Sequence, residues 1–171
     1  MSSRRYSCGG QATIEAALTL LVGLVPLSIA MLGFAEIAWT YHALATLTRQ
    51  GAQYAATHCW QDDSDSNVIN WMTANAPAFP DRSKLVTGEI PIQVRYWTND
   101  SANHLTNPFS CGGQSCSPEC VPDSVTVSIN GYYYNHFLPY FGFAPLLVPS
   151  FSTTMEIQGS GANSETGVSL P

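Results

Sequence analysis

Residues 10–58 read GQATIEAALTLLVGLVPLSIAMLGFAEIAWTYHALATLTRQGAQYAATH, and this stretch decides the fold of the chain. The run from Ala16 to Ala35 carries no charged side chain. About 20 such residues form a helix of roughly 30 Å, which matches the hydrocarbon core of a bilayer. Helical spacing then continues past Glu36 to His58. The sequence therefore predicts one helix over residues 11–58 that spans a membrane to about residue 36.

The composition also favours a membrane protein with one small head. The chain has 171 residues, of which 11% are charged, whereas soluble domains usually carry about 25%. The formal net charge is -6, and only six residues are Lys or Arg. Because binding to phosphates needs clustered basic side chains, we expect no nucleic-acid partner.

Residues 1–10 are interpreted as a short basic leader peptide. Arg4 and Arg5 precede the apolar run, and basic residues beside a span are retained in the cytoplasm. We therefore expect a single pass through the inner membrane, with the N-terminus inside and the C-terminal head exported. A secretory signal cut near Ala35 and Ala38 is the alternative, although its apolar core would usually have only about 7 to 15 residues.

The second half of the long helix is expected to pack on a sheet. Its small and apolar residues form a stripe: Ile37, Tyr41, Leu44, Thr48 and Ala55. Trp39 and Tyr41 fall where an interfacial belt of aromatic residues is expected. In the first half, Pro26 predicts a kink or a local loosening, because proline lacks the backbone N–H.

Residues 59–158 are predicted to form an exported α+β head. The polar run at 62–67 is interpreted as the N-cap of a short helix over 68–76 rather than as a calcium loop, which would need a glycine and a bidentate glutamate. Alternating apolar residues predict three strands of a small antiparallel sheet, at 90–97, 125–130 and 151–157. The long helix is the expected cover of the apolar face of this sheet. Residues 159–171, rich in Gly, Ser and Asn, are predicted to be a flexible tail.

Four of the five cysteines lie in the predicted head, and the fifth, Cys8, lies in the leader. Three of the four belong to a predicted loop over residues 98–122, which also contains His104. Paired C-x-x-C spacing is absent and the expected compartment is oxidising, so disulfides are favoured over a zinc site. We hypothesise that two loop cysteines pair and that the third reaches the end of the helix, which involves Cys59, Cys111, Cys116 and Cys120.

No arrangement of side chains typical of an enzyme stands out along the chain. No paired-carboxylate, Ser-His-Asp, phosphate-loop or metal-ligand arrangement in the sequence rises above chance. We therefore expect a structural or binding protein, with no catalytic residue, metal or cofactor.

The most informative constellation is Gly10, four intervening residues and Glu15, directly ahead of the apolar run. A small residue such as Gly10 lets a protease reach the next peptide bond, and a cut before Gln11 creates an ammonium terminus. Glu15 would then lie near that terminus, where a lone carboxylate in low dielectric favours a cationic partner, either its own N-terminus or that of a neighbouring subunit. Gly10 and Gln11 are thus interpreted as a processing site, and Glu15 as a charge that sets the register between helices. A glutamate that merely flanks an anchor is the alternative.

These residues resemble the type IV prepilin class, in which a prepilin peptidase cuts after glycine ahead of a glutamate at position five. The resemblance is closer to the TadE-like minor pilins or pseudopilins of the tight-adherence (Flp) pilus system. It covers residues 10–57 and 124–158, including Gly10, Glu15, Glu36, Arg49-Gln50-Gly51-Ala52 and Tyr54-Ala55-Ala56. Ala16 departs from the pattern, in which an aromatic residue often follows the glutamate.

The resemblance implies an α+β, pilin-like fold and a structural role as a processed, low-abundance subunit in the assembly of a Tad-type pilus. The implied partners are the prepilin peptidase, the inner-membrane pilus platform, the major pilin, other minor pilins and membrane lipid. A single-span, membrane-anchored binding domain unrelated to pili is the alternative.

Overall fold

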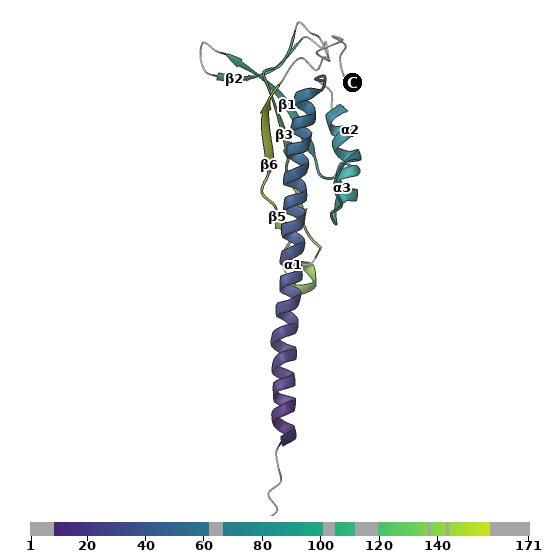
Figure 1. Cartoon of the computed structure of the whole chain (residues 1–171), viewed down its shortest axis with the longest axis vertical. Helices are drawn as coiled ribbons and strands as arrows, with labels where there is room; N and C mark the ends of the chain where they lie inside the picture. Colours follow the sequence, from purple (N-terminus) through teal and green to yellow (C-terminus); the bar gives the residue numbers. More distant parts are fainter. Residues whose placement is uncertain are drawn as a thin grey trace, which may run out of the picture. The chain divides into compact units, whose positions relative to one another are not determined.

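The computed structural model describes residues 9–61, 67–100, 105–111, 120–136, 138–142 and 144–157. It shows the predicted α+β fold, with a long N-terminal helix followed by a small antiparallel sheet (Figure 1). The chain divides into two compact units, Met1–Ala38 and Trp39–Pro171. Most of the predicted leader and the whole predicted tail lie outside the described residues.

Helix α1 runs from Gly9 to Thr57, which agrees with the prediction of one long helix. It continues through Pro26, and the Ser28 hydroxyl within the same stretch donates to the Leu24 carbonyl at 2.8 Å. At the other end, a ring nitrogen of His58 lies 2.9 Å from the Tyr54 carbonyl. The last turns of a helix leave carbonyls without helical partners, so this contact helps to close α1.

In the first unit, α1 presents apolar side chains on all sides. The largest of them are exposed: Ile14, Leu18, Leu20, Leu21, Val22, Leu24, Val25, Leu27, Met31, Leu32 and Phe34. A helix that is apolar all round is typical of a lipid or protein-interior environment. By length and composition, α1 can cross a membrane once.

The second unit contains a four-stranded antiparallel sheet in the order β2-β1-β3-β6. The three predicted strands are present as β1 (Ile92–Asp100), β3 (Ser124–Ile129) and β6 (Phe151–Glu156). Their register places Val127 opposite both Val94 and Thr153. The alternation of β-branched residues therefore predicted the centre of the sheet correctly.

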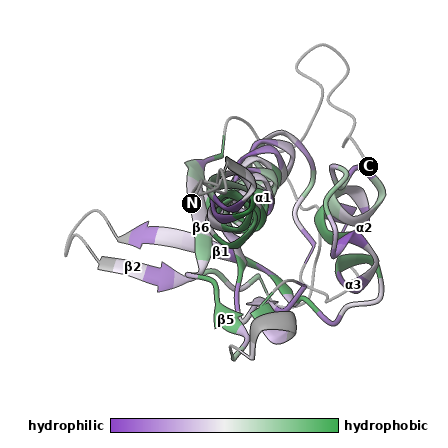
Figure 2. Cartoon of the chain, turned by 90° about the horizontal axis from the view of Figure 1, so that it is seen from below, coloured by the Kyte–Doolittle hydropathy of each residue, from purple (hydrophilic) through white to green (hydrophobic). Residues whose placement is uncertain are grey.

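Strand β2 (Leu105–Pro108) was not expected, because residues 98–122 were predicted to be a loop. β1 in fact continues to Asp100, and Thr98 pairs with Asn107 across the two strands. The residues of this part of the ribbon are mostly polar, as the hydrophilic colouring in Figure 2 shows, and those at 98–99 and 106–108 are exposed. Without a buried face it has no alternation of apolar and polar residues, which is the signal that sequence reasoning needs.

The core of the second unit lies between α1 and the sheet. Leu44 and Leu47 of α1 are buried, and so are the apolar residues of β3, Val125, Val127 and Ile129. Figures 1 and 2 show this part of α1 running along the sheet. The helix is thus the predicted cover of the apolar face, and its stripe of alanines allows a close approach: Ala52, Ala55 and Ala56 are all buried.

Two short helices pack beside α1, namely α2 (Asn67–Ala74) and α3 (Arg82–Val86). The predicted helix over 68–76 corresponds to α2, which ends two residues earlier. A Cβ added to Gly51 of α1 would overlap Met72 of α2, lying 2.9 Å from its Cγ. Glycine at position 51 therefore allows α1 and α2 to touch.

A chain excursion over residues 132–148 separates β3 from β6. It contains β4 (Tyr133–Tyr134), the short 3-10 helix η1 (Leu138–Phe141) and β5 (Leu146–Leu147), and β4 pairs with β5 as a separate two-stranded sheet. These two strands were not expected from the sequence, because strands of two residues are too short to show a period.

Candidate functional site

The predicted processing residues lie at the exposed start of α1. Gly10 and Gln11 are in its first turn, Glu15 is in its second, and all three are exposed. The Thr13 hydroxyl donates to the Gly10 carbonyl at 3.3 Å, and the Thr19 hydroxyl donates to the Glu15 carbonyl at 2.8 Å. A Cβ added to Gly10 would meet no heavy atom within 4 Å. The fold itself therefore does not require glycine at position 10.

Gln11 and Glu15 are four residues apart in one helix, so they occupy the same face one turn apart. Helical side chains also tilt toward the N-terminus, which directs the Glu15 carboxylate back along this face. The positive end of the helix dipole lies there as well. A cut before Gln11 would place an ammonium group within reach of the carboxylate.

Glu15 also borders a shallow, open and mainly apolar depression on α1, lined by Glu15, Leu18, Thr19, Val22 and Gly23. These residues follow the i, i+3, i+4, i+7 and i+8 spacing of one helix face. Gly23 has open space where a Cβ would lie, so another helix could approach its backbone closely. This face therefore carries a carboxylate at Glu15 and, at Gly23, a place where the backbone of another helix can approach closely.

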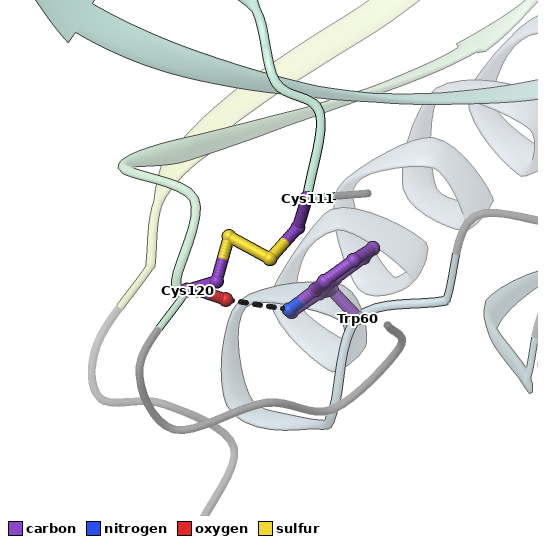
Figure 3. The surroundings of a disulfide bond; sticks show 3 residues. All are labelled: Trp60, Cys111 and Cys120. Carbon is purple, nitrogen blue, oxygen red and sulfur yellow. Dashed lines mark hydrogen bonds between the residues drawn. A yellow bond between two sulfur atoms is a disulfide. The ribbon is translucent and has the colours of Figure 1, made fainter. Parts of the chain in front are cut away.

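The disulfide predicted within the cysteine loop is present between Cys111 and Cys120, whose Cα atoms are 6.1 Å apart (Figure 3). Cys59 is also disulfide-bonded. The predicted link between it and a third loop cysteine lies outside the described residues. Cys116 and His104 lie outside them too. The pairing of two loop cysteines is thus confirmed.

Trp60 fixes the disulfide to the end of α1. Its indole N–H donates to the Cys120 carbonyl at 3.0 Å, as Figure 3 shows. Its ring contacts Phe109 edge-on at 4.9 Å and Tyr96 at 6.3 Å. Burial among these groups raises the pKa of Tyr96 to about 12, so its hydroxyl stays neutral at physiological pH. The cysteines serve a structural role in this arrangement.

A buried polar cluster around Asp81 was not foreseen from the sequence. One carboxylate oxygen lies 2.8 Å from Lys84 Nζ and 2.7 Å from His136 Nε2, and the other accepts the Tyr132 hydroxyl at 2.7 Å. Burial alone would raise the pKa of Asp81, but hydrogen bonds from Lys84, Tyr132 and His136 outweigh it and lower the pKa. The cluster ties the start of α3 to the excursion over residues 132–148.

No family model matches the chain, and no curated protein or solved structure matches it either. Among the described residues, no group of three or more His, Cys, Asp or Glu side chains could hold a metal ion. The residues at the start of α1 therefore remain the candidate functional site.

Proposed function

We propose that the chain is a minor pilin or pseudopilin-like structural protein that takes part in assembly of a Tad (Flp) type pilus. In this proposal a prepilin peptidase removes the leader by cutting between Gly10 and Gln11. The observation that carries it is the placement of Gly10 and Glu15 on the exposed first turns of a helix that is long and apolar enough to cross a membrane.

The proposed orientation follows from charge. Arg4 and Arg5 keep the leader on the cytoplasmic side of the inner membrane, and the second unit is exported. An oxidising compartment suits the Cys111–Cys120 disulfide of that unit. The proposed partners are the prepilin peptidase, the inner-membrane platform, the major pilin and other minor pilins.

Glu15 has the assembly role in this proposal. In the apolar environment of a membrane its carboxylate favours an ammonium partner, which is the trimmed terminus of the same chain or of a neighbour. The depression running from Glu15 to Gly23 offers a face for that neighbour. Ion pairing at one end and close packing at the other would fix the register of two helices.

The first test is cleavage. When the full chain is co-expressed with a prepilin peptidase, mass spectrometry of the membrane fraction should find a mature form that begins at Gln11. Gly10→Ala should slow cleavage several-fold, because the fold has room for this methyl group and only the peptidase can reject it. Gly23→Ala is the matched control and should be cut at the normal rate. Mature protein that still begins at Met1 or Ser2 would count against the proposal.

The second test separates processing from assembly. Glu15→Gln keeps the size of the side chain and removes its charge, so cleavage should continue while incorporation into sheared surface pili falls strongly. Glu89→Gln, which changes an exposed carboxylate of the second unit, is the control. Normal piliation by the Glu15→Gln variant would show that assembly does not need an ion pair at Glu15.

A single-span, membrane-anchored binding domain is the second candidate function, and the head fold suits it equally. It predicts that a prepilin peptidase leaves the leader intact and that Glu15→Gln has no effect. The two tests above therefore separate the candidates.

A further inference from the structure

The exposed apolar side chains of the second unit are unevenly distributed over its surface. Among its described residues, the large exposed ones are Trp39, Tyr41, Val86, Tyr133, Leu146 and Leu147. All except Val86 belong either to the first residues of α1 in this unit or to the β4–β5 sheet. No Asp, Glu, Lys or Arg occurs in the sequence between Asp123 and Glu156.

These two groups lie at the same end of the unit. The Tyr41 ring contacts the ring of Phe151, the first residue of β6, with 4.8 Å between centroids. Phe151 pairs with Ile129, the last residue of β3. The excursion over residues 132–148 therefore leaves and re-enters the sheet beside Tyr41, and Figure 1 shows β5 next to this part of α1.

The opposite end of the unit has a different character. A shallow groove there, between the end of α1 and the end of β6, is lined by Arg49, Gln53, Ala56, Thr57, Met155 and Glu156. Asp123 is exposed beside the same sheet end, where its carboxylate accepts the Asn99 backbone N–H. This end of the unit therefore carries charged side chains at its surface, whereas β4 and β5 carry none.

We propose that the apolar end, formed by Trp39, Tyr41, Tyr133, Leu146 and Leu147, rests on the lipid surface of the membrane that α1 spans. Trp39 follows Glu36 by three residues, which is about 4.5 Å of helix rise. It therefore lies at the level where the apolar run of the helix ends. Tyr41 holds the end of the sheet at this level through its contact with Phe151.

The chemistry of this end fits the boundary between headgroups and acyl chains. Trp and Tyr favour that zone because their rings are apolar and their N–H and O–H groups remain hydrated. Leucines on the β4–β5 sheet can enter the acyl region, and the segment has no formal charge of Asp, Glu, Lys or Arg to desolvate. His136, the one histidine of the excursion, faces Asp81, which also binds Lys84 and Tyr132.

The Asp81 cluster holds the base of the excursion in place. Tyr132 begins the excursion and is buried, and the Val148 backbone N–H donates to its carbonyl at 2.9 Å. β4 and β5 are therefore presented as a fixed projection and not as a loose loop. The proposal requires that α1 span a membrane but does not depend on the pilus function, because an anchored binding domain would make the same contact.

Photocrosslinking of the full chain tests this contact. A photoreactive phenylalanine analogue replaces Leu147 or, as the matched control, Val86; both side chains are 56% exposed. The protein is reconstituted in vesicles of phosphatidylethanolamine and phosphatidylglycerol and irradiated, and adducts are identified by mass spectrometry. Lipid adducts should be several-fold more frequent at position 147 than at position 86.

A second variant tests whether the two positions differ only in how efficiently the analogue reacts there. Leu146→Ser combined with Leu147→Ser, with the analogue placed at Tyr133, should reduce lipid adducts several-fold without changing the melting temperature of the head. Equal lipid labelling at positions 147 and 86 would overturn the proposal. Adducts at position 147 to a second copy of the chain, in place of lipid, would overturn it as well.

Discussion

The two units use the same helix in opposite ways. Leu21 in the first unit is 66% exposed, whereas Leu47 in the second is fully buried. Both residues belong to α1 and have the same intrinsic helix propensity. In the second unit the helix is thus covered by its own head, while in the first unit its large apolar side chains are exposed, as suits a helix that can cross a membrane.

The largest expected effect comes from the two leucines themselves. Leu47→Ala should lower the free energy of unfolding of the head by about 3 kcal/mol, because it removes buried methyl groups and leaves a cavity. Leu21→Ala should leave that free energy unchanged. Denaturant unfolding of the full chain in detergent micelles, followed by near-UV circular dichroism, measures both. Equal losses of stability in the two variants would contradict this difference between the units.

The carboxylates of Asp81 and Glu15 differ in the same way as the two leucines. Asp81 is 2% exposed, whereas Glu15 lies on the surface of α1. Asp81→Ala should lower the stability of the head by about 2 kcal/mol, because the buried Tyr132 hydroxyl loses its acceptor. Glu15→Ala should not change it. The same unfolding measurement distinguishes them, and a stable Asp81 variant would contradict the structural role of the cluster.

The lowered pKa of Asp81 predicts that the stability of the head depends on pH. The pKa of Asp81 is lower in the folded state than its ordinary value of 3.8. The contribution of Asp81 to stability is therefore fully present above about pH 3.8 and is lost as the pH falls through the folded pKa. The stability difference between wild type and Asp81→Ala should therefore shrink in acid. Parallel unfolding curves between pH 6 and about pH 2 would show this, and a constant difference would contradict the lowered pKa.

The two glycines give the smallest expected effect. Gly51→Ala should destabilise the head by about 1 kcal/mol, because overlap with the buried Met72 outweighs the gain in helix propensity. Gly23→Ala has open space and should leave the head unchanged. Met72→Ala should cost less stability in the Gly51→Ala background than in the wild type, because it removes the overlapping side chain. Fully additive effects of the two changes would argue against the clash.

The sequence was sufficient for features that repeat a local pattern. The long helix followed from uniform apolarity, and β1, β3 and β6 followed from the alternation of residues such as Val125, Thr126 and Val127. The pairing of two loop cysteines followed from their spacing and expected compartment. Each of these signals lies within a few neighbouring residues.

The features that were missed depend on partners distant in the chain. Tyr132 and Asp81 are separated by 51 residues, and no local pattern relates them. The polar strand β2 becomes a strand only because β1 continues beside it. At the start of α1, the sequence indicated Gly10, Gln11 and Glu15, and the structure adds the helix face that joins Glu15 to Gly23.

The hydrogen bond between Thr13 and the Gly10 carbonyl has a kinetic consequence. The Gly10–Gln11 peptide bond lies inside a helical turn, so an enzyme that binds its substrate in an extended form must open that turn before it can act. Helix ends fray with a free energy near zero, whereas the interior of a long helix opens far less readily. Because the bond lies within one turn of the helix end, opening that turn would cost little free energy and would leave the rest of α1 intact.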